Sequence, residues 1–153
     1  KLPMDERMLQ TYAKQVADGC YEYVLEVLKV TRPVVEALSK KYKLVLVSNF
    51  YGNIQTILKD FELYTFFDDI IESSVVGVRK PDPAIYRLGV EAMGYEAGKV
   101  LVVGDSFSKD VVPAKQVGCM VAWLKGEGWG GEVIDESVPD VILTNLAGLP
   151  ALL

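Results

Sequence analysis

The amino-acid sequence predicts an α/β protein built on a doubly wound parallel sheet. Short apolar runs alternate along the chain with longer amphipathic segments, and this alternation is typical of a parallel sheet with helices on both faces. The run at 100–103 is unbroken, rich in valine and followed at once by glycine, as expected for a buried parallel strand that ends in a tight turn. At 153 residues, the chain is long enough for one domain with its own core.

Five segments are predicted as strands of this sheet. They cover residues 44–47, 70–72, 100–103, 120–124 and 141–143. Helices are predicted between them from apolar residues at helical spacing and from the residues at the helix ends. Asp82 is the expected N-cap of one helix, with Pro83 in its first turn, and Gly118 is expected to end another.

The N-terminal region is predicted to be helical. Apolar residues recur at helical spacing over residues 4–30, and Gly19 is expected to separate two helices. A strand over residues 23–30 is the alternative, because that stretch also contains short apolar runs. Thr31 and Pro33 are expected to start a further helix, because threonine caps helix N-termini and proline fits the first turn.

Composition excludes several classes of function. The 16 basic and 21 acidic residues give a net charge of −5, and no basic stripe is present to contact the phosphates of a nucleic acid. No apolar run is long enough to span a membrane, and no signal-peptide pattern opens the chain. Two widely separated cysteines, Cys20 and Cys119, are typical of reduced thiols, so we expect a cytoplasmic protein. The absence of histidine excludes Ser-His-Asp and Cys-His catalysis within the chain and disfavours a zinc site.

Polar side chains follow three of the predicted strands, at the edge where the carboxyl ends of parallel strands meet. They are Ser48 and Asn49 after the first strand, Lys80 in a loop after the second, and Asp105 and Asp110 after the third. Ligands of open α/β sheets collect at this edge. A hydroxyl, an amide and an ammonium group suit the oxygens of a phosphoryl group, and two carboxylates suit Mg²⁺.

Each of these residues also has a purely structural interpretation. Ser48 and Asn49 could cap the next helix, Asp105 could cap a turn, and Lys80 could be a solvated loop charge. Prolines at 81 and 83 stiffen the loop of Lys80, which favours a fixed position for its ammonium group. Trp129, in a glycine-rich loop over 125–131, is the one local candidate for contact with a substrate, although a loop tryptophan more often packs against its own loop.

Three motifs, taken in this order, resemble motifs II, III and IV of the haloacid dehalogenase-like (HAD) hydrolase superfamily. They are Ser48-Asn49, then Arg79-Lys80-Pro81-Asp82-Pro83, and then Gly104-Asp105-Ser106 with Asp110. The resemblance covers residues 31–145, and the helical segment before it resembles the tail of the family's helical cap domain. It implies a cap remnant over 1–30 and a Rossmann-like core over 31–153 that lacks its first strand.

The resemblance also implies roles for these residues. Ser48 and Asn49 would bind the transferred phosphoryl group, and Lys80 would pair with the nucleophile and the phosphate. Asp105 would be the ligand of Mg²⁺, and Asp110 would support the metal without touching it, by contacting the metal's ligands or through a water molecule. Family members that dehalogenate haloacids without a metal do not usually have Gly-Asp in motif IV, so this motif favours a Mg²⁺-dependent phosphatase over a haloacid dehalogenase.

The family's motif I, which carries the nucleophilic aspartate, is missing. Asp-x-Asp does not occur anywhere in the sequence. We therefore interpret the chain as the C-terminal portion of a truncated phosphatase of small phosphomonoesters, inactive alone because the residue that forms the aspartyl-phosphate lies outside it. A non-catalytic phosphate- or partner-binding module is the alternative. A receiver-like signalling domain is disfavoured, because such domains have acidic residues first, then a hydroxyl and then a lysine, whereas here the order is hydroxyl, lysine and acid. A dinucleotide-binding domain is disfavoured by the absence of Gly-x-Gly-x-x-Gly.

The missing motif has a structural consequence. In the family its strand lies between the strands predicted here at 44–47 and 100–103, so its loss would expose the flanks of both. Each apolar side chain left exposed loses about 1.5–3 kcal/mol. We expect the slot to be filled by a separate N-terminal fragment, by a second chain, by direct pairing of the two flanking strands, or by residues 23–30. The expected partners are these and a small phosphorylated substrate, with no nucleic acid and no membrane.

Overall fold

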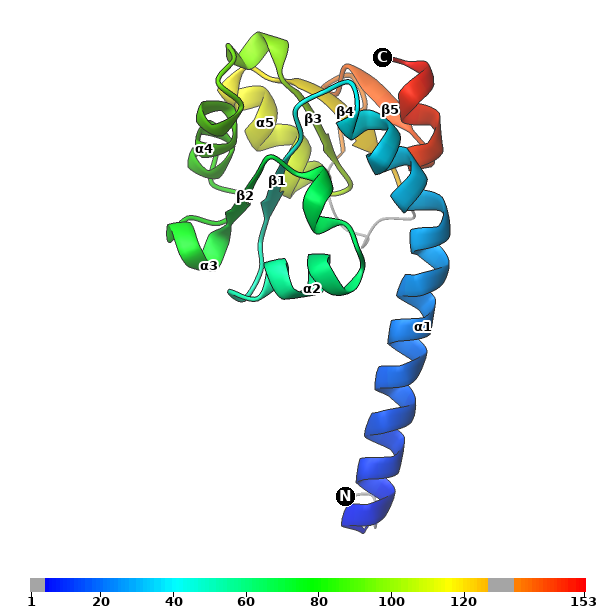
Figure 1. Ribbon diagram of the computed structural model, residues 1–153. Coiled ribbons are helices and arrows are strands. Elements are labelled where there is room, and N and C mark those ends of the chain that lie inside the picture. The colour runs from blue at the N-terminus through cyan, green and yellow to red at the C-terminus, as the bar shows by residue number, and fades with distance from the viewer. Residues whose placement is uncertain (1–4, 127–133) are drawn as a thin grey trace.

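The computed structural model describes residues 5–126 and 134–153, and its strands form two parallel sheets (Figure 1). In one sheet β1 (Val45–Ser48) pairs with β2 (Asp69–Glu72). In the other, β4 (Met120–Leu124) lies between β3 (Leu101–Gly104) and β5 (Val141–Leu143). The predicted parallel α/β architecture is confirmed, and each strand begins within one residue of its predicted position.

Helices connect the strands. The α-helices are α1 (Glu6–Ser39), α2 (Ile54–Asp60), α3 (Ser73–Val76), α4 (Ala84–Met93) and α5 (Val112–Val117). Shorter helical turns are η1 (Tyr64–Phe66), η2 (Ala97–Lys99), η3 (Phe107–Val111) and η4 (Leu146–Ala151). Gly118 ends α5 with a left-handed φ of 94°, as predicted. Helix α4 begins one residue later than predicted, with Pro83 as its N-cap in place of Asp82, although Asp82 still accepts the backbone N–H of Ala84 at 2.8 Å.

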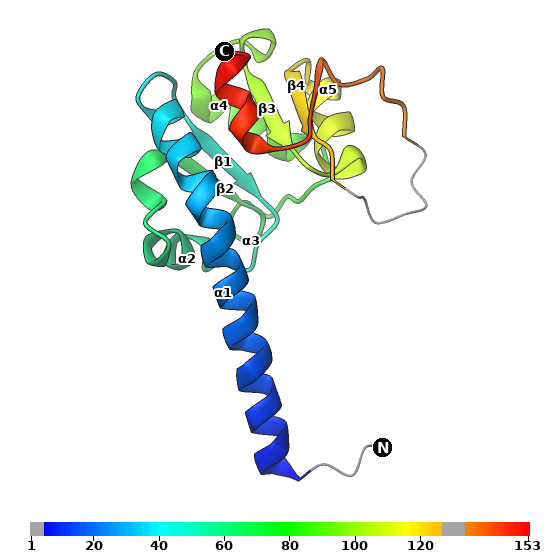
Figure 2. The same ribbon diagram turned by 90° about the vertical axis from the view of Figure 1, so that its right-hand side faces the viewer.

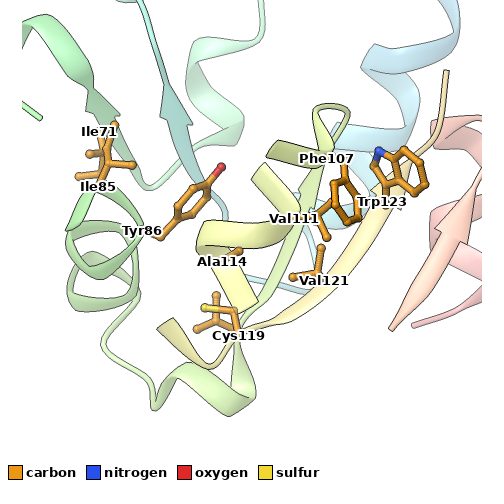
Figure 3. Packing of buried hydrophobic residues seen from close by; sticks show 10 residues of the cluster. Ile71, Ile85, Tyr86, Phe107, Val111, Ala114, Cys119, Val121 and Trp123 are labelled. Carbon is orange, nitrogen blue, oxygen red and sulfur yellow. The ribbon is translucent and has the colours of Figure 1, made fainter. Parts of the chain in front are cut away.

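Helices cover both faces of the strands, as the doubly wound arrangement requires. Helices α4 and α5 cover one face, where Ile85, Val111 and Val121 are fully buried (Figure 3). On the other face, Val34 and Leu38 of α1 pack with η4 against β4 and β5. Helix α2 closes the opposite side of β1 and β2. The strands whose carboxyl ends carry the polar edge are thus packed against apolar cores.

Helix α1 differs from its prediction. It is one helix of 34 residues that runs through Gly19, Thr31 and Pro33, so the predicted breaks at these positions are wrong, and so is the alternative of a strand over 23–30. A glycine inside a helix costs only about 1 kcal/mol. The ring of Pro33 is on the exposed side of α1, where the loss of one backbone hydrogen bond is tolerated.

The N-terminal half of α1 extends away from the rest of the molecule (Figures 1 and 2). Residues 5–23 are all exposed, and contacts with the body begin at Tyr21, whose hydroxyl donates to Asp60 at 2.9 Å. Because the helix passes residue 30 without interruption, the proposed boundary between cap remnant and core lies inside a single element and stays a prediction. No helix among the described residues is long and apolar enough to cross a membrane.

The two sheets do not join. Strand β1 pairs with β2 and strand β3 with β4, and no pairing links β1 to β3 among the described strands. A cleft of about 500 Å³ lies between them, lined along its length by 44–47 on one side and 100–105 on the other. Of the four expected ways of filling this slot, direct pairing of the flanking strands and insertion of residues 23–30 are therefore wrong.

Candidate active site

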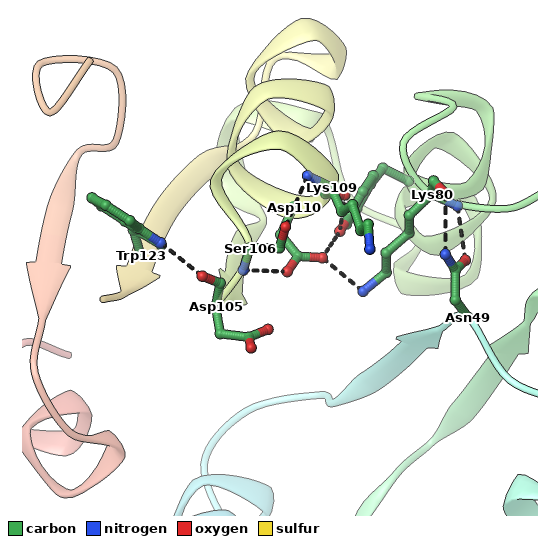
Figure 4. Close-up of polar contacts among 8 residues, drawn as sticks. Asn49, Lys80, Asp105, Ser106, Lys109, Asp110 and Trp123 are labelled. Carbon is green, nitrogen blue, oxygen red and sulfur yellow. Dashed lines mark hydrogen bonds and ion pairs between the residues drawn. The ribbon is translucent and has the colours of Figure 1, made fainter. Parts of the chain in front are cut away.

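An ion pair between Lys80 and Asp110 is the centre of the polar edge. Lys80 Nζ lies 2.8 Å from Asp110 Oδ1, and the two side chains are 17% and 5% exposed. The same carboxylate oxygen accepts the hydroxyl proton of Tyr86 at 2.6 Å, and the other accepts the backbone N–H of Ser106 at 2.9 Å (Figure 4). Three donors from three segments therefore hold Asp110 in one position.

The turn after β3 brings Asp110 under the strand end. Residues 107–111 form one π-helical turn, in which the N–H groups of both Asp110 and Val111 point to the carbonyl of Ser106 at 2.8 and 3.2 Å. Gly104 makes room for it, because a Cβ at this position would lie 2.6 Å from Asp110 Cγ. Glycine is thus required here by close approach, and the Gly-Asp motif has a steric reason.

Asn49 fixes the backbone of Lys80. The Lys80 N–H donates to Asn49 Oδ1 at 2.8 Å, and Asn49 Nδ2 donates to the Lys80 carbonyl at 3.0 Å (Figure 4). The end of β1 is therefore tied to the loop of Lys80 by a two-point amide contact. The ammonium group of Lys80 also lies 5.6 Å from the centre of the Tyr86 ring.

The loop after β1 is held by the end of β2. Glu72 is only 4% exposed, and its Oε1 accepts the backbone N–H groups of Gly52 at 2.5 Å and Ile54 at 3.4 Å. Its neighbour Ser73 bonds to both the N–H and the carbonyl of Phe50 through its hydroxyl. These contacts fix the segment that follows Ser48 and Asn49.

Asp105 differs from Asp110 in exposure and direction. It is exposed, its side chain points away from Asp110 (Figure 4), and it lines the cleft together with Lys80. Its backbone carbonyl accepts the indole N–H of Trp123 at 2.9 Å. Of the two carboxylates, Asp105 is the one that is open to a ligand.

These residues fit a Mg²⁺ ion held by one carboxylate. Within the described ranges 5–126 and 134–153, no group of three or more acidic, histidine or cysteine side chains could hold a metal. Mg²⁺ does not need such a cage, because it keeps several waters and binds one or two carboxylates together with substrate phosphate. The exposed Asp105, which lines the cleft together with Lys80, provides that kind of position.

The electrostatics of the pair follow from its partners. Burial raises the pKa of the Asp110 carboxyl, but the Lys80 ammonium and the hydrogen bonds from Lys80, Tyr86 and Ser106 outweigh burial and leave this pKa below its usual value. Burial and the Asp110 carboxylate both raise the pKa of Tyr86. At neutral pH the site therefore holds an ionised Asp110 and a protonated Tyr86 that donates to it.

The structure brings Asn49, Lys80 and Asp110 together as the sequence predicted, with Asp105 on the same edge and Ser48 at the end of β1. Sequence reasoning missed Tyr86, Glu72 and Trp123. A tyrosine or tryptophan on the inner side of an element needs a partner for its polar atom, and this was the available signal for Tyr86 and Trp123. Trp129, the candidate for substrate contact, lies outside the described residues.

Comparison with known proteins identifies the class. The sequence profile of the haloacid dehalogenase-like hydrolase family matches residues 5–118, which is more than half of the chain and includes all the residues of the polar edge. The chain belongs to this family of hydrolases.

Particular relatives include phosphatases. The chain is 31% identical to a phosphoglycolate phosphatase of Aquifex aeolicus, over 86% of this chain and 56% of that protein. It is 32% identical to the mouse (Mus musculus) haloacid dehalogenase-like hydrolase domain-containing protein 3, over 90% of this chain and 58% of that protein. The crystal structure of a HAD phosphatase from Thermococcus onnurineus superposes with a TM-score of 0.71 and 32% identity, covering 80% of this chain and 56% of that one. The chain thus spans little more than half the length of these relatives.

Proposed function

We propose that the chain supplies the phosphate- and metal-binding part of a Mg²⁺-dependent phosphatase of small phosphomonoesters. The observation that carries this proposal is the linkage of Asn49, Lys80 and Asp110, with the exposed Asp105 beside it at the mouth of the cleft. The names of relatives, a phosphoglycolate phosphatase and a glyceraldehyde 3-phosphate phosphatase among them, support a small phosphorylated substrate.

Each residue has a role in this proposal. Ser48 and Asn49 donate hydrogen bonds to the phosphoryl oxygens; Asn49 has a second amide N–H besides the one that donates to Lys80. The Lys80 ammonium neutralises a phosphoryl oxygen and the nucleophile. Asp110 holds that ammonium in place, and Asp105 is the metal ligand. A bound Mg²⁺ would supply further positive charge against the phosphoryl oxygens.

The nucleophile is the missing part. The sequence has no Asp-x-Asp, and among the residues that the structure describes, no carboxylate other than Asp105 and Asp110 follows an apolar strand at the cleft. We propose that an aspartate from outside residues 1–153 forms the aspartyl-phosphate, and that it arrives on a strand placed between β1 and β3. The unpaired edges of these strands and the apolar lining of the cleft suit such a strand. A separate N-terminal fragment or a second chain could provide it, and the chain alone would be inactive.

The proposed compartment is the cytoplasm. Neither cysteine forms a disulfide: Cys20 is exposed on α1, and Cys119 is buried in the core. Free thiols of this kind suit a reducing compartment.

The test is hydrolysis of an aryl phosphate by the full reading frame that contains this chain, with and without Mg²⁺. We expect Mg²⁺-dependent hydrolysis that falls at least 100-fold in Asp105→Asn. Glu91→Gln, which removes an exposed carboxylate of α4 that does not line the cleft, is the matched control and should leave the rate unchanged. Hydrolysis that is absent in the wild type, or that survives Asp105→Asn, would contradict the proposal.

A further inference from the structure

Trp123 contacts the loop that carries Asp105 from the neighbouring strand. It lies on β4 opposite Gly104 in the parallel register and is only 3% exposed. Its Nε1–H donates to the carbonyl oxygen of Asp105 at 2.9 Å. The only polar atom of the indole thus forms a hydrogen bond with the backbone of the residue proposed to bind the metal.

The opposite side of the same peptide unit is also held. The N–H of Ser106 belongs to the peptide bond that begins with the Asp105 carbonyl, and it donates to Asp110 Oδ2 at 2.9 Å. Trp123 and Asp110 therefore form hydrogen bonds with the carbonyl oxygen and the N–H of one peptide unit, from opposite sides (Figure 4). Because a peptide unit is planar, holding both atoms restricts rotation about the Cα–C bond of Asp105, and this limits the directions in which its side chain can leave the strand.

The indole ring itself is closely packed. Its ring meets Phe107 edge-on with the centroids 5.6 Å apart, and the ammonium group of Lys125 lies 5.6 Å from the ring. A donor packed in this way needs no ordering when a ligand arrives.

From this geometry we propose that Trp123 is a positioning residue for the metal site: its indole N–H fixes the Asp105–Ser106 peptide so that the Asp105 carboxylate faces the cleft. This inference rests on the proposed role of Asp105 as metal ligand. Groups that orient a ligating carboxylate affect metal affinity without touching the metal.

The first test measures Mn²⁺ binding to the chain in the presence of inorganic phosphate, by the electron paramagnetic resonance signal of the free ion. Mn²⁺ is the probe because it shares the preference of Mg²⁺ for carboxylate and water ligands. We expect Trp123→Phe, which keeps a ring but loses the N–H, to weaken binding about three- to tenfold, and Asp105→Asn to abolish site-specific binding. Leu143→Val, which removes buried volume from β5 of the same sheet, is the control for destabilisation and should bind as the wild type does.

The second test needs no metal. Amide hydrogen exchange of Ser106 reports local opening of the Asp105–Ser106 peptide. We expect this exchange to be several-fold faster in Trp123→Phe, with no such change in Leu143→Val.

The outcomes separate the two proposals. If Asp105→Asn abolishes Mn²⁺ binding while Trp123→Phe behaves like Leu143→Val in both tests, the positioning role is wrong and the metal site stands. If the wild type binds no Mn²⁺, or Asp105→Asn leaves the affinity unchanged, the role of Asp105 as metal ligand is wrong, and the positioning role is overturned with it.

Discussion

Two aspartates five residues apart have opposite environments. Asp110 is buried and takes three hydrogen bonds from the chain, whereas Asp105 is exposed at the mouth of the cleft. The difference arises from the π-helical turn after β3, which directs Asp110 inward beneath Gly104. One carboxylate is thereby used for hydrogen bonds within the chain, and the other faces the cleft.

Replacement of Gly104 by alanine should displace Asp110. The added Cβ would collide with the Asp110 side chain, and this cannot be relieved without moving the ion pair with Lys80. We expect the free energy of unfolding, measured by urea denaturation, to fall by about 1–3 kcal/mol. Gly98→Ala is the control, because a Cβ there meets no atom within 4 Å. Equal stability of the two variants would contradict the close approach at Gly104.

The Lys80–Asp110 pair should make stability depend on pH in the acid range. The pKa of Asp110 is lower in the folded chain than the value of about 3.9 expected for an unfolded aspartate, so its contribution is fully present above that value. The contribution is lost as the pH falls from about 4 toward the folded pKa.

Asp110→Asn removes this contribution and leaves the Lys80 ammonium without its partner. We expect the wild type to exceed Asp110→Asn in free energy of unfolding by at least about 2 kcal/mol at pH 6, and the difference to shrink below pH 4. Urea denaturation across this pH range measures it. A difference that grows as the pH falls would show that Asp110 is not held as an ionised carboxylate.

At the scale of elements, the strands could be predicted and the long helix could not. Each strand is a short run of mainly apolar residues, and such a run is typical of a strand in a parallel sheet. In α1, Gly19 and Pro33 look like helix boundaries in the sequence, but one helix passes through both, because keeping each residue in the helix costs less than interrupting the helix there. Residues 6–30 are helical, as the apolar spacing over 4–30 predicted. Three of the apolar residues at this spacing, Met8, Tyr12 and Val16, are nevertheless exposed, because periodicity shows which residues share a side of a helix and not what covers that side.

The continuity of α1 can be tested at Gly19. In the middle of an exposed helix, alanine is favoured over glycine by about 0.5–1 kcal/mol, and a Cβ at position 19 meets nothing within 4 Å. We therefore expect Gly19→Ala to increase the helical signal in far-ultraviolet circular dichroism and to slow amide exchange over residues 15–25. If Gly19 joined two separate helices, the alanine variant would leave both measurements unchanged or weaken them.

At the scale of the whole molecule, the open cleft is the main feature. Motif order in the sequence indicated where polar groups would gather, because parallel strands bring their carboxyl ends to one edge. The hydrogen-bond partners of the Asn49 and Trp123 side chains could not be predicted, because these partners are backbone atoms distant in the sequence. Asn49 bonds to Lys80, 31 positions away, and Trp123 bonds to Asp105, 18 positions away. The separation of β1 from β3 divides the strands into two sheets and leaves the proposed site beside an unpaired edge on each side.

The most direct measurement is hydrolysis of p-nitrophenyl phosphate in Mg²⁺ by the purified chain, alone and mixed with a separately made fragment from the reading frame upstream of Lys1. We expect the chain alone to show no hydrolysis above the uncatalysed rate. The mixture should gain activity that saturates at one fragment per chain and disappears in Asp105→Asn. Mg²⁺-dependent hydrolysis by the chain alone at the rate of the mixture would contradict a nucleophile supplied from outside residues 1–153. A mixture as inactive as the chain would contradict a strand placed between β1 and β3.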